Sequence, residues 1–295
     1  MLDNKKSVVI ALGYFDCLHL GHVTVLEKAR KVAKQLNAEA VAFTFDGDLR
    51  SAVNGKKQGS VYTLEERKNL LSSLGIEIVY CAPVTQEFLS LSKEEFLDLL
   101  NEEYNVLAYC CGFDYRFGNK GLGDVEFLKE YATKNRQDVY LLPPYELEGQ
   151  KVSTSVIKTF LQEGNVKKAN AFLGRNYFLS GEVFRDRKIG AKIGFPTVNI
   201  KISPDKYPLK SGVYSGRVRI DDKEYKTVIN YGHRPTFGLE DKLCEAHIID
   251  YNGDLYGKIL TLEFTDFIRD IRKFSSALEL KEQLIVDVEK VRAND

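Results

Sequence analysis

The stretch GYFDCLHLGH at residues 13–22 follows the apolar run VVIAL at residues 8–12, and it decides the fold of the first half of the chain. An apolar, β-branched run of this length predicts a buried strand. After the stretch, apolar residues recur at steps of three and four, which predicts a helix. The stretch therefore connects the end of a strand to the beginning of a helix.

The two histidines of this stretch stand where an anion would bind. Ligands of open α/β sheets bind outside the carboxyl ends of strands, and a helix N-terminus favours negative charge. His19 and His22 can face the same side if the helix begins at Gly21, which has no Cβ and lets a nucleotide approach. Two alternatives remain, a pair that only caps the helix and a zinc site. Zinc is disfavoured because two ligands are too few and His233 and His247 lie in the other half.

The rest of the first half continues the same alternation. Capping-box patterns at residues 63–66 and 92–95 open two more helices. Strands are expected at residues 40–45, 76–80, 106–111 and 139–142. Strands that alternate with helices predict an α/β doubly wound parallel sheet. Dinucleotide binding is disfavoured because GxGxxG is absent from this stretch, and there is no GxxxxGK[ST] loop.

The second half has a different rhythm. After a short helix at residues 166–173, closely spaced strands predict a small antiparallel β-barrel, followed by a C-terminal helix from Ser275 to about Arg292. The strands are expected at residues 177–184, 197–200, 212–220, 225–231, 245–250 and 258–267. We therefore expect two domains, residues 1–176 and residues 177–295.

Composition excludes several classes of protein. The 295 residues include 42 basic and 42 acidic side chains, too balanced for a nucleic-acid binder. The first apolar run is too short for a signal sequence or a membrane span. Five cysteines without a CxxC pair argue against a disulfide framework or a structural zinc cluster, so we expect a cytoplasmic protein.

The HxGH tetrad within GxFDxxHxGH resembles the nucleotidyltransferase superfamily, and within it the bacterial bifunctional riboflavin kinase/FAD synthetase family. The resemblance extends to TLEERK at residues 63–68, GFDYRFG at 112–118 and VSTS at 152–155. It implies adenylyl transfer from ATP to FMN, with His19 and His22 as catalytic donors to phosphate oxygens. The implied ATP-binding residues are Gly13, Phe15, Asp16, Gly21, Ser153, Thr154 and Lys158, and the implied flavin-binding residues are Phe113, Asp114, Phe117 and Asn119. Each of these roles has an alternative. Asp16 could simply be a turn residue, and the aromatic rings could pack in the core. Ser153 and Thr154 could simply cap a helix.

The chain departs from the pattern of this family at two places. After the STS triplet the family usually supplies two arginines, whereas this chain has Val156 and Lys158. After residues 44–45 the family usually has His-Pro, whereas this chain has Asp-Gly-Asp at 46–48. Because an ammonium lacks the forked geometry of a guanidinium, we expect weaker triphosphate binding.

A second motif, GAKIGFPTVN at residues 190–199, lies at the entry of a predicted strand. Thr197 and Asn199 alternate onto one face, where their oxygens can complete a Mg²⁺ shell. The run resembles the riboflavin kinase signature, as do the segments at 212–214, 230–238 and 245–247. The resemblance implies that Glu245 is the catalytic base, and it implies phosphate or flavin contacts for Gly190, Lys192, Gly194, Pro196 and Arg234. We interpret His233 and His247 as structural, and Arg269 and Arg272 as a solvated face.

The sequence thus favours a two-step enzyme that phosphorylates riboflavin to FMN and adenylylates FMN to FAD, with ATP and Mg²⁺. A single-activity enzyme whose adenylyl-transfer site is degenerate is one alternative. A flavin- or nucleotide-binding regulatory module is the other. We expect small-molecule partners, neither nucleic acid nor membrane, and a monomer or weak oligomer.

Overall fold

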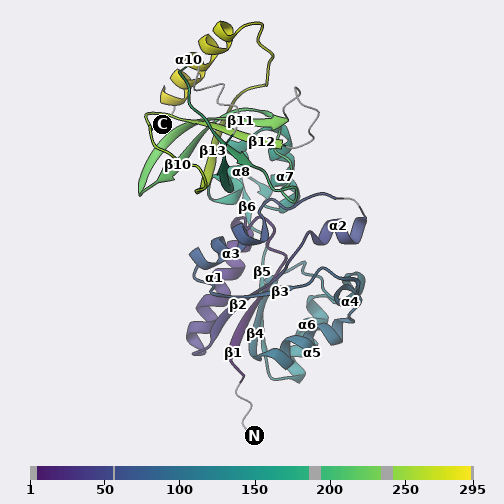
Figure 1. Cartoon of the computed structure of the whole chain (residues 1–295). Coiled ribbons are helices and arrows are strands. Elements are labelled where there is room, and N and C mark those ends of the chain that lie inside the picture. Colours follow the sequence, from purple (N-terminus) through teal and green to yellow (C-terminus); the bar gives the residue numbers. More distant parts are fainter. Residues whose placement is uncertain (1–4, 56, 186–193, 234–241, 294–295) are drawn as a thin grey trace. The chain divides into compact units, whose positions relative to one another are not determined.

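The computed structural model describes residues 5–55, 57–185, 194–233 and 242–293 (Figure 1). The chain divides into two compact units, Met1–Thr154 and Ser155–Asp295. Within the described ranges, no helix combines the length and the apolar character that crossing a bilayer requires.

The first unit is built on a five-stranded parallel sheet in the order β3-β2-β1-β4-β5. Its strands are β1 (Ser7–Leu12), β2 (Glu39–Phe45), β3 (Ile78–Ala82), β4 (Asn105–Gly112) and β5 (Asp138–Leu142). The expected doubly wound sheet is confirmed. Because β1 pairs with both β2 and β4, the strand order reverses beside β1, and a crevice at this switch point is where such sheets bind ligands.

Helices cover both faces of this sheet (Figure 1). Alternate residues of β1 point to opposite faces, so Val9 packs with α1 and α3 while Ile10 packs with α5 and α6. The helices are α1 (Leu20–Gln35), α2 (Leu49–Asn54), α3 (Leu64–Ser73), α4 (Gln86–Leu89), α5 (Lys93–Glu103) and α6 (Val125–Lys134). Both expected capping boxes are present, at Thr63 and at Ser92. A short hairpin of β6 (Glu146–Leu147) and β7 (Gln150–Lys151) follows β5.

The second unit contains a closed six-stranded barrel in the order β10-β11-β12-β9-β8-β13, with every pair antiparallel. Its strands are β8 (Tyr177–Phe184), β9 (Val198–Lys201), β10 (Gly212–Ile220), β11 (Lys223–His233), β12 (Lys242–Ile248) and β13 (Ile259–Arg269). Large rings fill its core, because Tyr177, Tyr214, Tyr231 and Phe264 are all fully buried. The C-terminal helix α10 (Ala277–Ala293) packs on the barrel, where Val291 meets Val213 and Val228.

The division between the units lies earlier than the boundary at 176/177 expected from sequence. Two helices, α7 (Thr154–Glu163) and α8 (Val166–Leu173), fall almost entirely in the second unit. Hydrogen bonds explain why α8 belongs there. The Asn170 amide donates to the Phe264 carbonyl oxygen at 2.8 Å and accepts from the backbone N–H of Tyr177 at 2.7 Å. These bonds attach α8 to β13 and β8.

Candidate active sites

His19 is the N-cap of α1, and this position fixes its chemistry. Its imidazole is 7% exposed, and its Nδ1 accepts a hydrogen bond from the backbone N–H of His22 at 3.1 Å. A neutral imidazole that accepts through Nδ1 carries its proton on Nε2. The cap therefore makes Nε2 of His19 a hydrogen-bond donor.

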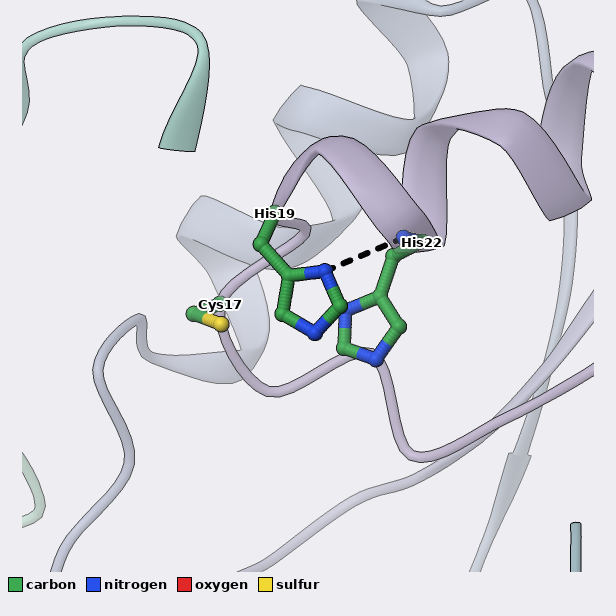
Figure 2. Close-up of side chains that lie close together, drawn as sticks. All are labelled: Cys17, His19 and His22. Atoms are coloured by element: carbon green, nitrogen blue, oxygen red, sulfur yellow. Dashed lines mark hydrogen bonds between the residues drawn. The ribbon is translucent and has the colours of Figure 1, made fainter. Parts of the chain in front are cut away.

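The imidazole of His22 stacks on that of His19, with ring centroids 3.6 Å apart and planes 13° from parallel. Phe15, whose φ is +50°, supports His22 edge-on at 5.2 Å. Gly13 is required here, because a Cβ on it would lie 2.8 Å from the Phe15 ring. In Figure 2 the Nε2 atoms of both histidines point to the same side, away from the helix. The two imidazoles therefore lie on one side of the α1 N-terminus, as the spacing predicts.

Asp16 lies in the same loop, where it anchors another segment. Its carboxylate is fully buried and accepts from the backbone N–H of Val61 at 2.7 Å. Beneath the loop lies Arg67, 2% exposed, which donates to the Thr44 hydroxyl at 2.8 Å and to the Phe45 carbonyl oxygen at 2.9 Å. Arg67 also donates to the carbonyl oxygen of Tyr14 at 3.3 Å, so it ties together the carboxyl ends of β1 and β2.

Thr154, the first residue of α7, meets this loop through Cys17. The Cys17 sulfur and the Thr154 hydroxyl oxygen are 3.4 Å apart. Ser153 precedes Thr154 directly, and Lys158 lies one helical turn after it on the same face. Lys158 is 5% exposed and belongs to the second unit, where its ammonium lies 4.7 Å from the centroid of the Tyr207 ring.

The loop after β4 supplies ring surface to the same edge of the sheet. Phe113 is 44% exposed, and the Lys151 ammonium lies 4.9 Å from its ring centroid. Lys151 also forms an ion pair with Asp114 at 2.7 Å. Asn119 lies further along, where its backbone N–H donates to the carbonyl oxygen of Leu91 at 2.7 Å.

Phe117, which the sequence analysis assigned to flavin binding, lies in the hydrophobic core. Its ring is 5% exposed and packs against Phe96 at 5.3 Å and Tyr115 at 5.8 Å. A ring enclosed in this way has no face to offer a flavin. Alternating aromatic residues in a sequence do not reveal which of them turns inward.

The segment that replaces the usual His-Pro of the family is used for local structure. Asp46 accepts from the backbone N–H of Val84 at 2.9 Å. Asp48 caps α2 by accepting from the backbone N–H of Ser51 at 3.1 Å, and it also accepts from Gly59 at 2.7 Å. Both carboxylates therefore hold the loops around α2.

In the barrel, three predicted residues come together. The hydroxyl of Thr197, just before β9, donates to Oε1 of Glu245 on β12 at 2.7 Å. Asn199 on β9 lies directly opposite Glu245 in the strand register and is 6% exposed. A cavity of about 240 Å³ adjoins this group and is lined by Pro196, Thr197 and Tyr256 among others. Hydroxyl, amide and carboxylate groups thus lie together, and Thr197 links this group to the cavity.

The remaining residues of the second motif are only partly described. Gly194 has φ +89°, a conformation that favours glycine. The Nδ1–H of His247 donates to the carbonyl oxygen of Pro196 at 2.8 Å, so His247 holds the entry of β9. Gly190, Lys192 and Arg234 lie outside the described residues, as does the side chain of His233.

Arg269 is not part of a solvated face. Its side chain is 17% exposed and binds the fully buried carboxylate of Asp287, with the closest contact at 2.7 Å. This pair fastens α10 to β13. Arg272 is half exposed and lies 3.7 Å from Glu279, as expected for a surface residue.

Sequence reasoning missed Cys17, Arg67 and Lys151 as parts of the first site. Lys151 precedes the STS triplet by two residues, and a basic side chain at that spacing was an available signal. For Cys17 and Arg67 the contacts join segments distant in sequence, with Thr154 and with the ends of β1 and β2. Local patterns do not report such contacts.

Comparisons with known proteins give a family match for each half of the chain. Residues 2–156 match the family model for FAD synthetase, and residues 173–294 match that for riboflavin kinase. The bifunctional riboflavin kinase/FMN adenylyltransferase of Bacillus subtilis is 31% identical over 290 residues, covering 97% of this chain and 92% of its own. That of Listeria monocytogenes is 32% identical over 288 residues, covering 97% of this chain and 91% of its own.

One solved structure resembles the whole chain. It is described as a macrolide-efflux protein from Streptococcus pneumoniae, with a TM-score of 0.89, 31% identity, and coverage of 99% of this chain and 96% of that one. The activity in that description is said of that protein only. The two family models and the bifunctional relatives together determine the assignment, and the single-activity and regulatory alternatives are not favoured. The chain belongs to the bifunctional riboflavin kinase/FMN adenylyltransferase family and is an enzyme of flavin-cofactor synthesis.

Proposed function

We propose that adenylyl transfer takes place at the carboxyl ends of β1 and β4, and that riboflavin phosphorylation takes place around Glu245 in the barrel. The observation that carries the proposal is the hydrogen bond from Thr197 to Glu245, with Asn199 beside it in register. It joins the three residues that the kinase motif singles out. For the first site, the stacked pair of His19 and His22 supports the assignment of adenylyl transfer.

In adenylyl transfer, the FMN phosphate attacks the α-phosphorus of ATP and pyrophosphate leaves. Such a step depends mainly on positioning and on stabilising charge at the phosphate oxygens. Nε2–H of His19 donates one hydrogen bond to those oxygens, since the cap bond assigns its proton to Nε2. His22 donates the second from the adjacent ring. Gly13, Phe15 and Gly21 position the two imidazoles. Asp16 holds the loop between β1 and α1 through its bond to Val61.

The other residues of the first site bind the two substrates. The exposed face of Phe113 takes the flavin ring, with Asp114 and Asn119 beside it. Lys151, through its contacts with Phe113 and Asp114, adds a positive charge to this loop. Ser153 and Thr154, at the beginning of α7, and Lys158, one turn further along the helix, contribute to triphosphate binding.

In the kinase reaction, Glu245 accepts the proton of the ribityl hydroxyl as that oxygen attacks the γ-phosphorus of ATP. The hydrogen bond from Thr197 to Oε1 orients the carboxylate, so that Oε2 meets the substrate. The cavity lined by Pro196 and Thr197 receives ATP, and Gly194 precedes Pro196 by two residues. Gly190, Lys192 and Arg234 complete the phosphate and flavin contacts.

The donor set of the barrel site fits Mg²⁺. The Thr197 hydroxyl donates a hydrogen bond to Glu245, so its oxygen lone pairs can face a cation, and the Asn199 amide oxygen is a second hard donor. Mg²⁺ held by these two oxygens would neutralise charge on the triphosphate. A nitrogen or sulfur ligand would be expected for a softer metal, and neither is in this group.

The setting of the enzyme follows from the same reasoning. The five cysteines, all of which lie within the described residues, form no disulfide, which suits the reducing cytoplasm. Balanced charge suits small-molecule substrates rather than nucleic acid or a membrane surface. We propose a monomer or weak oligomer.

One assay tests the assignment of both activities. Purified protein is incubated with ATP and Mg²⁺ and with either riboflavin or FMN, and the flavins are separated by chromatography. Riboflavin should yield FMN and then FAD, and supplied FMN should yield FAD. If FMN forms but FAD does not, the assignment of adenylyl transfer to the first site is wrong. If FAD forms from supplied FMN but riboflavin is not phosphorylated, the assignment of the kinase reaction to the barrel is wrong.

A further inference from the structure

Cys17 lies beside His19 and His22, and the adenylyl-transfer reaction gives its thiol no role. One ligand atom from each residue lies within 4.8 Å of the other two. In Figure 2 the Cys17 sulfur points toward the imidazole of His19, which stacks on that of His22. The sequence analysis counted only the two histidines as possible zinc ligands, and the structure places the Cys17 thiol beside them.

We propose that this cluster binds a soft divalent cation, with Zn²⁺ as its preferred ion, and that the bound cation inhibits adenylyl transfer. Thiolate and imidazole donors favour Zn²⁺ over Mg²⁺. The Mg²⁺ that the reactions use is therefore a poor competitor for this cluster. The inhibition, though not the binding, rests on the proposed role of the two histidines.

The geometry needs a small adjustment to close around the ion. Tetrahedral zinc, with bonds of about 2.3 Å to sulfur and about 2.1 Å to nitrogen, holds its ligand atoms about 3.4–3.6 Å apart. The three atoms here need to approach by about 1 Å, which side-chain rotation can supply. Because the stacked rings are nearly parallel, one of them must turn so that both nitrogens aim at the ion.

Binding also moves a proton at each of the three ligands. The Cys17 thiol releases its proton to solvent as the sulfur–metal bond forms. For Nε2 of either histidine to bind the ion, the proton on Nε2 must move to Nδ1. At His19 this shift removes the cap bond from the backbone N–H of His22. The loss of one N-cap is small beside the free energy of a thiolate–imidazole zinc site. The hydroxyl of Thr154, 3.4 Å from the sulfur, can donate to the thiolate that remains.

Three protein ligands leave a fourth position for water or a phosphate oxygen, as in exchangeable rather than structural zinc sites. The ion would then occupy the atoms that donate to the nucleotide. His22 is half-buried, so the cluster is open to solvent on that side although Cys17 is fully buried. The expected effect is reversible loss of FAD formation with no loss of FMN formation.

The test uses the full-length protein and the metal alone, without substrate. Co²⁺ is titrated into the protein, and a near-ultraviolet thiolate-to-cobalt absorption band is expected that Zn²⁺ abolishes by displacement. Cys17→Ser should lose the band, and Cys81→Ser, which changes the half-buried cysteine of β3, should keep it. Absence of the band in the native protein, or its persistence in Cys17→Ser, overturns the proposal. Thermal unfolding of each variant checks that it is folded.

A second measurement addresses inhibition. FAD formation from FMN and FMN formation from riboflavin are followed at increasing Zn²⁺ and constant Mg·ATP, each variant normalised to its own rate without zinc. Zn²⁺ should inhibit only FAD formation in the native protein, and Cys17→Ser should need at least about tenfold more zinc. Equal inhibition of both reactions, as expected if zinc acts on ATP, overturns the inhibitory role. If FAD formation is absent without zinc, the proposed function fails while the cobalt spectrum still reports the site.

Discussion

The two sites of this chain are held in place by different kinds of contact. In the barrel, Asn199 and Glu245 are opposite one another in a ladder of backbone hydrogen bonds, and Thr197 adds one side-chain bond. In the first unit, His19 is the N-cap of α1 and His22 lies in the first turn of that helix, and side-chain contacts hold both rings. Backbone hydrogen bonds between strands remain when a side chain is replaced, whereas a side-chain contact is lost with the residue that makes it. Substitutions should therefore separate the two reactions cleanly.

The largest effect should come from removing divalent cations. This treatment should not distinguish the two sites, because both reactions should stop. Each reaction must neutralise a triphosphate, so a chelator should stop FMN and FAD formation and excess Mg²⁺ should restore both. The measurement is the rate of each reaction against free Mg²⁺. A reaction that continues in excess chelator would show that its site needs no metal.

Glu245→Gln should give the next largest effect, and only on the kinase. The amide keeps the shape of the side chain but cannot accept the hydroxyl proton, so FMN formation should fall by about 10²–10⁴-fold. FAD formation from supplied FMN should remain. Glu224→Gln is the matched control, because Glu224 is an exposed carboxylate of the same barrel, paired with Arg217 at 2.9 Å. Near-normal riboflavin phosphorylation by Glu245→Gln would exclude Glu245 as the base.

His19→Asn should affect the other site and separate its two roles. Asparagine is a good N-cap, so it can still accept from the backbone of His22, but it has no ring Nε2–H. FAD formation should fall by about 10²–10³-fold, the cost of one lost donor to a transition-state oxygen. FMN formation and thermal stability should be retained.

His19→Ala is the control for this prediction. It removes both the cap and the donor, so it should lose about 1 kcal/mol of stability in addition to FAD formation. If His19→Asn kept full adenylyl transfer, the cap alone would be the role of His19.

The comparison also explains how far the sequence could predict each site. Thr197 and Asn199 share a face because strand side chains alternate, a rule that holds before the fold is known. The burial of Phe117 could not be predicted, because alternation does not say which face is buried. The ion pair of Arg269 could not be predicted either, because its partner Asp287 lies on another element, α10. Cys17 contacts Thr154, which lies 137 residues later in the sequence. Local chemistry is predictable from sequence, and long-range contacts require the fold.

The smallest effect should come from Lys158, where the chain departs from the arginines of its family. Lys158 shares a helix face with Thr154, which supports a triphosphate contact, but its ammonium also lies over the ring of Tyr207. Lys158→Met keeps the buried aliphatic volume and removes only the charge, whereas Lys158→Ala removes both. If the charge binds ATP, both variants should raise the KM for ATP in adenylyl transfer by about tenfold, since a charge-assisted contact is worth about 1.5 kcal/mol or more. Riboflavin phosphorylation should stay nearly unchanged. If Lys158→Met behaves like the native protein while Lys158→Ala lowers the melting temperature, the residue only fills space beneath Tyr207, and the triphosphate must be held by Ser153, Thr154 and the histidine pair.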